Sequence, residues 1–194
     1  GTFTFSTVKY VSKLLGTAGV TVAEQTLAKD MLAYVKSAYA YFNSEDKDAV
    51  TAQINAVLGG YDKTEIDRVQ NGAIADNNDI IDGVTFSLGA TPAIRFYINA
   101  DADEYTFKVG NSAVASEDIT AGSDADGNYV DISLLAYKMI SDITVECANA
   151  TATYHINEYY DGVDKSDTAL VDIVTKFYNY CASASKYRNS VIGE

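Results

Sequence analysis

The sequence predicts an α+β protein in which an antiparallel, sandwich-like sheet has long helices packed against it. Two observations lead to this fold class. Apolar residues recur at helical spacing near both ends of the chain, and from residue 84 onward their period changes to two. With 47% hydrophobic residues, the chain of 194 residues can bury a core and hold one large domain or one domain plus part of another.

The first long helix is predicted in VAEQTLAKDMLAYVKSAYAYF, where apolar residues stand at 27, 31, 34, 38 and 41. These steps of four and three residues place them on one helix face. The C-terminal segment around NYCASASKYR repeats the helix at an offset of 146, so that Tyr34 corresponds to Tyr180 and Tyr41 to Tyr187. We interpret these tyrosines as packing residues.

The similarity extends upstream, where TFSTVKYV (Thr4–Val11) aligns with TYHINEYY (Thr153–Tyr160). The repeated unit is predicted to be a strand end, an aromatic turn, a loop and a long helix. Because a full set of strands precedes only the second copy, we expect the N-terminal segment to resemble the tail of a preceding repeat in a tandem array. A single fold with two related helices is the alternative.

Between the two copies, Ser44 is predicted to cap a helix in EDKDAVTAQINAVL that ends at Gly59. The polar residues 61–83 indicate a linker or loop. Strands are predicted in VTFSL, AIRFYIN, EYTFKV, NYVDISL, DITVECA and ATATYHI, with a short helical crossover in LLAYKMIS. The expected organisation is a helical segment over 1–60, a linker over 61–83, and a sandwich over 84–190 closed by the C-terminal helix.

The charge balance, 14 basic against 27 acidic residues, gives a formal net charge of −13. Such a surface repels phosphate backbones and anionic lipid, which disfavours nucleic acid and membrane surfaces as partners. The sequence has no apolar run long enough for membrane insertion. We interpret the start at Gly1, without an initiator Met or a signal-like stretch, as that of an excised piece or a mature form. Abundant Tyr, Thr, Ser, Asn and Asp with few Lys is typical of secreted bacterial surface proteins.

Calcium is the metal to consider, because DADE (101–104) and SDADGN (123–128) are rich in Asp. An EF-hand loop that starts at Asp124 requires Gly at position 6 and Glu at position 12, but Gly127 falls at position 4 and Leu135 at position 12. Hairpin turns use Asp and Gly for backbone reasons alone. Asp124 and Asp126 are therefore weak metal candidates, and we expect no cofactor.

Catalytic groups are difficult to assemble from this sequence. His155 is the only imidazole, which leaves no His cluster for zinc and no catalytic triad. Cys147 and Cys181 fit small buried hydrophobic residues, and a disulfide between them stays open because an extracellular setting permits one. Paired carboxylates can hydrolyse glycosides, yet among 27 acidic residues some close pair is expected by chance. We assign no catalytic residue.

Surface recognition has the best candidates. Alternation turns Arg95, Tyr97 and Asn99 outward on AIRFYIN, and Tyr129 and Asp131 outward on NYVDISL. If these strands are neighbours, Tyr97 and Tyr129 form an exposed aromatic face with polar groups beside it. Sugar-binding proteins use such faces, because a ring stacks on a pyranose while side chains bond its hydroxyls. The alternative is that cross-strand Tyr and Arg only stabilise an exposed sheet.

The segment AKDMLAYVKSAYAYF, with its Y-x-x-A/S-A-x-x-Y/F pattern, resembles a helix of an accessory domain in secreted and cell-surface proteins of anaerobic Gram-positive gut bacteria. SLGATPAIRFYI, EYTFKV, GNYVDISLLAYKMISDITVEC and ATYHINEYY follow in the order of that family, over about residues 84–190. Val35-Lys36 and Cys181-Ala182 depart from its usual Gly and Gln. The resemblance implies a sandwich, a crossover and a closing helix, beside adhesin-like, carbohydrate-active or wall-anchored modules. It assigns no functional residue.

We therefore expect a non-catalytic module of a large bacterial surface protein, extracellular and either secreted or associated with the cell wall. Its expected function is binding or adhesion, to glycan or to a surface protein, with other domains of the same chain as neighbours. A structural spacer in a tandem array is the alternative, and a glycan-acting enzyme is the remote one.

Overall fold

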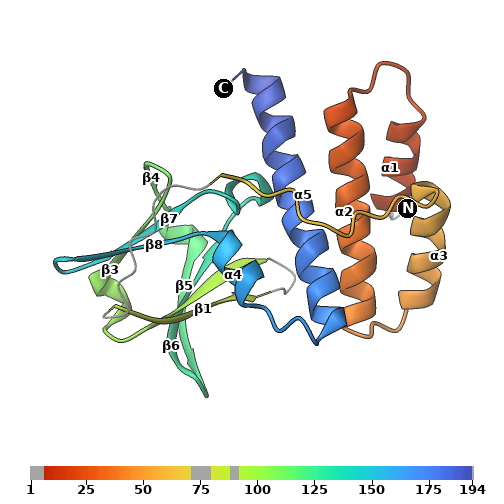
Figure 1. The fold of residues 1–194 in the computed structure, drawn as a ribbon. Helices are drawn as coiled ribbons and strands as arrows, with labels where there is room; N and C mark the ends of the chain where they lie inside the picture. Colours follow the sequence, from red (N-terminus) through yellow and green to blue (C-terminus); the bar gives the residue numbers. More distant parts are fainter. Residues whose placement is uncertain (1–6, 71–79, 88–91, 194) are drawn as a thin grey trace, which may run out of the picture. The chain divides into compact units, whose positions relative to one another are not determined.

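In a computed structural model, residues 7–70, 80–87 and 92–193 of the chain are described (Figure 1). Within these residues the chain forms five α-helices and two four-stranded antiparallel sheets, which confirms the predicted α+β class. The helices are α1 (Thr7–Leu15), α2 (Val22–Tyr41), α3 (Lys47–Leu58), α4 (Ile156–Gly162) and α5 (Thr168–Ile192). The strands are β1 (Ile81–Ser87), β2 (Ala93–Ile98), β3 (Tyr105–Val109), β4 (Ser112–Ala113), β5 (Ile119–Asp124), β6 (Gly127–Ser133), β7 (Ile143–Cys147) and β8 (Ala150–Tyr154).

The chain divides into two compact units. The helical unit is formed by the two ends of the chain, the residues up to Arg68 and those from Val163 onward. It contains α1, α2, α3 and α5. The strand unit, Val69–Gly162, contains both sheets and α4. The sequence grouped the C-terminal helix with the strands, whereas the structure groups it with the N-terminal helices.

The core of the helical unit forms where α1, α2 and α3 meet, around the buried side chains of Val11, Leu32, Ile54 and Leu58. A capping box fixes the start of α2, because Thr21 and Glu24 each accept a backbone hydrogen bond from the other. The helix α3 ends at Gly59, which adopts the left-handed conformation at φ 57°.

Two local predictions in the helical unit were wrong. Residues 7–11, expected as a strand end and turn, belong to α1, because apolar residues at 8, 11, 14 and 15 give one helical face that packs on α2 and α3. Residues 4–6 of that prediction lie outside the described part of the chain. The N-cap of α3 is Asp46 and not Ser44, whose carbonyl instead accepts the backbone N–H of Lys47 in the preceding turn.

The two related helices pack against each other in opposite directions. Tyr34 of α2 stacks on Tyr180 of α5, with ring centroids 6.0 Å apart and planes 6° apart, and Phe177 contacts Tyr34 at 5.1 Å. Burial raises the pKa of Tyr34 to about 12. Tyr34 and Tyr180 therefore pack, as the sequence predicted, whereas Tyr41, also expected to pack, is 38% exposed. At Tyr34 and Tyr180, corresponding positions of the two sequence copies meet each other, as they would on a local two-fold axis.

The helices of the two copies also begin at corresponding residues. Thr7 and Ile156, aligned at an offset of 149, start α1 and α4. Val22 and Thr168, aligned at an offset of 146, start α2 and α5, and the preceding residue in each case is an N-cap whose side chain accepts a backbone N–H. The sequence similarity thus coincides with the helix boundaries.

The strand unit is an antiparallel sandwich. The first sheet has the strand order β1-β2-β6-β5 and the second has β4-β3-β7-β8. Phe96 on β2 joins the two sheets, since its ring lies 5.6 Å from Phe107 on β3 and 5.7 Å from Tyr154 on β8. A 3₁₀ turn at Ala136–Lys138 lies in the predicted crossover, where the chain passes from the first sheet to the second.

None of the helices in the described part of the chain combines the length and the apolar character needed to cross a bilayer.

Candidate functional site

The outward-facing residues predicted on β2 and β6 lie side by side on the first sheet. The two strands pair with Arg95 opposite Asp131 and Tyr97 opposite Tyr129. Between them the inward positions of both strands are buried. The neighbouring strand β5 adds Asp124 at its end. We call these five residues, Arg95, Tyr97, Asp124, Tyr129 and Asp131, the Arg95 face.

Ion pairs connect the three charged residues of the Arg95 face. Arg95 binds Asp131 through two parallel hydrogen bonds, Nε to Oδ1 at 2.8 Å and Nη2 to Oδ2 at 2.9 Å. Its Nη1 donates to Oδ2 of Asp124 at 2.7 Å. The side chains of Arg95 and Asp131 are only 19% and 18% exposed, so this bidentate pair is shielded from much of the solvent. The bond to Asp131 is the main reason why the pKa of Arg95 is raised.

The two tyrosines hold the guanidinium and each other. The guanidinium carbon of Arg95 lies 3.4 Å from the ring centroid of Tyr129, a close cation–π contact. The rings of Tyr97 and Tyr129 are 6.3 Å apart and meet edge to face at 77°. Both are half-buried. The predicted pair of tyrosines is present, but its rings are not co-planar, because Tyr129 stacks on Arg95 and lies down on the sheet.

Each ring lies against a glycine on an outer strand, but only the glycine beside Tyr129 is needed to make room for the ring. A Cβ atom on Gly122 of β5 would lie 2.6 Å from Cζ and from the hydroxyl oxygen of Tyr129. Gly83 of β1 pairs with Tyr97 in the register, and a Cβ atom there would lie 3.7 Å from Cδ2 of that ring. The Tyr129 ring therefore occupies the space above Gly122, where any residue other than glycine would place a side chain.

Asp124, a weak metal candidate in the sequence, closes this network. Its Oδ1 accepts the backbone N–H of Asp126 at 2.9 Å, as expected of an Asp that opens a hairpin turn, and its Oδ2 accepts the Tyr97 hydroxyl at 3.2 Å. Although desolvation acts to raise it, the pKa of Asp124 is lowered by these bonds and by Arg95. Among the described residues no group of three or more His, Cys, Asp or Glu is placed to hold a metal ion.

Asn99 does not join the Arg95 face. It lies just beyond the end of β2, and its side-chain oxygen accepts the hydroxyl of Tyr105 at 3.0 Å. Tyr105 belongs to the second sheet, so Asn99 links the edge of one sheet to the other. Of the five predicted ligand-binding residues, the structure thus brings Arg95, Tyr97, Tyr129 and Asp131 together and adds Asp124.

A second polar cluster ties the start of the predicted linker to the helical unit. Lys176 of α5 is 3% exposed, donates to the carbonyl of Lys63 at 2.9 Å and forms an ion pair with Asp62. Asn179, one turn further on, donates to the carbonyl of Glu65 and accepts the backbone N–H of Asp67, both at 2.9 Å. Residues 61–67 are therefore held along α5 although they form no helix or strand.

Asp30 of α2 contributes to the same cluster from the opposite helix. Its side chain is 1% exposed, its Oδ1 accepts the Tyr61 hydroxyl at 2.6 Å, and Lys63 lies 3.9 Å from its Oδ2. Desolvation raises the pKa of Asp30, and the hydrogen bond from Tyr61 only partly offsets this. The sequence patterns did not predict burial of Asp30, Lys176 and Asn179, because charged and amide side chains on a helix ordinarily lie on its solvated face.

His155 is buried at the start of α4. Its backbone N–H donates to Glu158 at 2.8 Å, which caps the helix. Its Nδ1 lies 2.8 Å from Oδ1 of Asp142, but off the direction of a hydrogen bond, and neither ring nitrogen is hydrogen-bonded within the described residues. The two cysteines are free and buried, and burial raises the pKa of the Cys181 thiol. No disulfide joins them.

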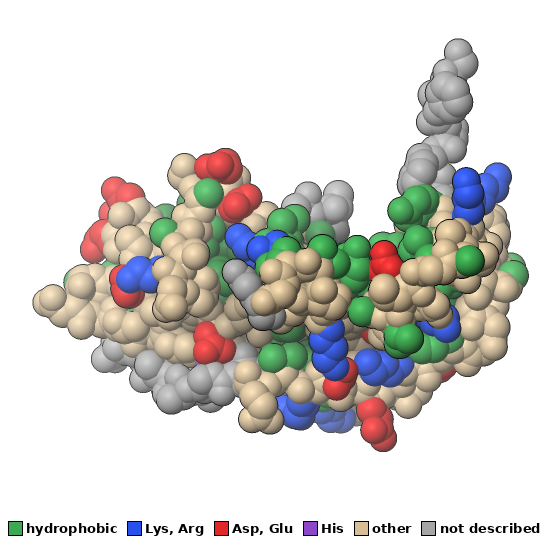
Figure 2. Space-filling view, turned by 90° about the horizontal axis from the view of Figure 1, so that it is seen from above, with side chains coloured by type: hydrophobic (Ala, Val, Ile, Leu, Met, Phe, Trp, Pro, Cys, Tyr) green, Lys and Arg blue, Asp and Glu red, His purple; other side chains and the backbone are tan. Residues whose placement is uncertain are grey.

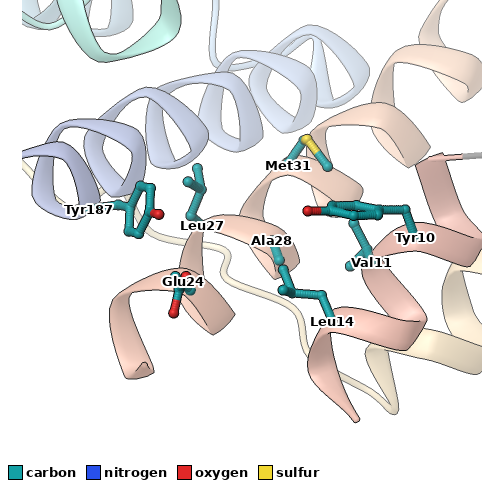
Figure 3. Close-up of a pocket in the computed structure, with 8 residues that line it drawn as sticks. All are labelled: Tyr10, Val11, Leu14, Glu24, Leu27, Ala28, Met31 and Tyr187. Carbon is teal, nitrogen blue, oxygen red and sulfur yellow. The ribbon is translucent and has the colours of Figure 1, made fainter. Parts of the chain in front are cut away.

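A pocket of about 220 Å³ lies between α1, α2 and α5 (Figure 3). Its lining is mainly apolar, from Tyr10 and Leu14 on α1 to Leu27 and Met31 on α2. Glu24 is the only charged side chain in the lining, and the bonds of the capping box, led by that with the Thr21 backbone, lower its pKa. The pocket offers shape and apolar surface but few polar groups to orient a ligand.

The Arg95 face offers more polar groups to a ligand than the apolar pocket does. It places N–H donors, carboxylate acceptors and an aromatic ring within one network on a partly exposed sheet surface. No protein-family model matches the chain, and neither a curated protein nor a solved structure matches it.

Proposed function

We propose that this chain is a non-catalytic recognition module of an extracellular bacterial surface protein, and that the Arg95 face binds glycan. The observation that carries the proposal is the joint position of two tyrosines, a guanidinium and two carboxylates on one sheet surface. Planar bidentate groups beside an aromatic ring are suited to sugars, which present hydroxyls at their rim and C–H groups on their faces.

The charge state of the face favours binding over hydrolysis. Asp124 has a lowered pKa and is held as a carboxylate by Arg95, Tyr97 and the Asp126 backbone. Glycoside hydrolysis requires a carboxylic acid with a raised pKa to protonate the leaving group. A carboxylate fixed by an arginine accepts hydrogen bonds from hydroxyls but is a poor proton donor.

Affinity electrophoresis tests this proposal directly. The purified chain would be run in native gels that contain starch, cellulose, xylan, pectin or mucin, beside Tyr97→Ala and Tyr129→Ala. Tyr41→Ala is the matched control, because Tyr41 is 38% exposed on α2 of the helical unit. We expect one polymer to retard the chain and the control, and to lose its effect on the two sheet variants. Circular dichroism checks that each variant is folded. If no polymer retards the chain, the binding proposal fails.

A structural spacer is the second candidate function. The specific observation in its favour is that the two related helices stack Tyr34 on Tyr180 and begin at corresponding residues. Units that recur in tandem pack against their neighbours in such repeated contacts. The same gels separate the candidates, because a spacer passes unretarded through every polymer.

A further inference from the structure

We infer that the Arg95 face takes a neutral, hydroxyl-rich polysaccharide and excludes polyanionic ones. The inference rests on the proposed glycan binding and specifies its ligand class. Three observations support it: the distribution of charge along the chain, the state of the only basic side chain in the first sheet, and the balance of hydrogen-bond donors and acceptors on the face.

The net charge of the protein is concentrated in the strand unit. Val69–Gly162 contains 15 acidic and 3 basic residues, a net charge of −12, whereas the rest of the chain contains 12 acidic and 11 basic residues. Figure 2 shows Asp and Glu side chains on the surface of the strand unit, with few Lys or Arg among them. The unit that carries the Arg95 face therefore repels anionic polymers as they approach.

Within the described strands of the first sheet, no cationic charge is left over to receive an anion. Arg95 is the only basic residue in the four strands of the first sheet. Asp131 and Asp124 both lie within hydrogen-bond distance of its guanidinium, at 2.7 to 2.9 Å. The three side chains together carry one net negative charge. A uronate, sulfate or phosphate group on the ligand would approach Arg95 only beside two carboxylates.

Hydroxyl groups match this mixed surface. The bonds described above use three of the five N–H donors of Arg95, and each oxygen of Asp131 accepts one bond from it and retains a lone pair. A sugar hydroxyl both donates and accepts, so it can bridge a guanidinium N–H and a carboxylate oxygen. An anion can only accept, and an ammonium group can only donate.

The test uses polymers that share a backbone and differ in charge. Suitable pairs are hydroxyethylcellulose with carboxymethylcellulose, methyl-esterified homogalacturonan with polygalacturonate, and arabinoxylan with glucuronoxylan. Affinity electrophoresis of the full chain gives a dissociation constant for each member. For the backbone that binds, we expect the neutral member to bind about tenfold more tightly at low salt. This ratio should shrink in 1 M NaCl, where the Debye length is about 3 Å.

The variants assign the binding to the face and separate two kinds of failure. Tyr129→Ala should weaken binding of the neutral member, and Tyr41→Ala should leave it unchanged. If the anionic member binds as tightly or more tightly and Tyr129→Ala abolishes that binding, the face binds glycan but the inferred ligand class is wrong. If neither member of any pair retards the chain, the proposed function itself fails, and the inference fails with it.

Discussion

Replacement of Gly122 by Ala is the sharpest test of how the Arg95 face is held together. The new Cβ would lie 2.6 Å from the outer end of the Tyr129 ring, well inside the usual carbon–carbon contact of about 3.5–4.0 Å. The ring must therefore swing away by about 1 Å. This shift weakens its stacking on Arg95, a contact worth about 0.5–2 kcal/mol, and its edge contact with Tyr97, worth about 0.5–1.5 kcal/mol.

Gly83→Ala is the matched control on the other side of the same face. A Cβ there meets the Tyr97 ring at 3.7 Å, an ordinary contact. Both substitutions remove backbone freedom from the unfolded chain, which stabilises by about 0.4–1 kcal/mol. We expect Gly83→Ala to be neutral or slightly stabilising. Gly122→Ala should lower the free energy of unfolding by about 1 kcal/mol relative to Gly83→Ala, because the ring contacts are weakened in Gly122→Ala alone.

Urea unfolding of both variants, followed by far-ultraviolet circular dichroism, measures the difference. The chain contains no Trp, so nuclear magnetic resonance provides the local readout: the Nε–H signal of Arg95 should shift in Gly122→Ala, as the Tyr129 ring moves off the guanidinium. Gly122→Ala should also weaken any glycan binding, although it removes no polar group. If Gly122→Ala is as stable as Gly83→Ala and the Arg95 signal is unchanged, the Tyr129 ring is not fixed as described.

Three further predictions concern the helical unit. Lys176→Met keeps the buried stem but removes the bonds to Asp62 and to the Lys63 carbonyl, so the free energy of unfolding should fall by about 1–3 kcal/mol in urea titrations; an unchanged midpoint would mean that the ion pair is not formed. The raised pKa of Asp30 means that folding binds a proton, so its contribution to stability is present at low pH and is lost as the pH rises through the folded pKa. In the native protein, the free energy of unfolding should therefore fall as the pH rises above the usual carboxyl range, and this fall should be smaller in Asp30→Asn. Unfolding of both proteins at a series of pH values measures it; the same dependence on pH in both would contradict a raised pKa of Asp30. Cys181, buried and with a raised pKa, should not react with a thiol reagent in the native protein and should react once the protein is unfolded.

Sequence patterns predicted the parts of the fold where one local period dominates. Strict alternation on β2 and β6 placed Arg95, Tyr97, Tyr129 and Asp131 outside, and the register then set them opposite each other. The strand β5, ITAGSD, escaped prediction because its two strand formers, Ile119 and Thr120, are followed by four residues that disfavour strands or are neutral, so that it owes its conformation to pairing with β6. The pairing of β5 with β6 therefore places Asp124 on the Arg95 face, whereas the sequence alone indicates Asp124 only as a weak calcium ligand.

The buried polar contacts of the helical unit could not be predicted for a different reason. Asn179 binds the backbone of Asp67, and Lys176 that of Lys63, across more than a hundred residues of sequence. Nothing local to α5 marks these two side chains as buried, and segment 61–67 looks polar and unstructured. The repeat carried a signal, because Lys176 and Asp30 occupy corresponding positions at the offset of 146 and both are buried.

The helical unit is formed by segments from both ends of the chain, and this has a mechanical consequence. The chain enters the strand unit at Val69 and leaves it at Gly162, and the flanking segments on both sides belong to the helical unit. A pulling force applied to the chain on either side is therefore transmitted through the contacts of α2 with α5, and the sandwich bears load only after those contacts shear apart. In a protein tethered at a surface and exposed to flow, the face that carries Arg95 would keep its geometry under tensions that the paired helices withstand.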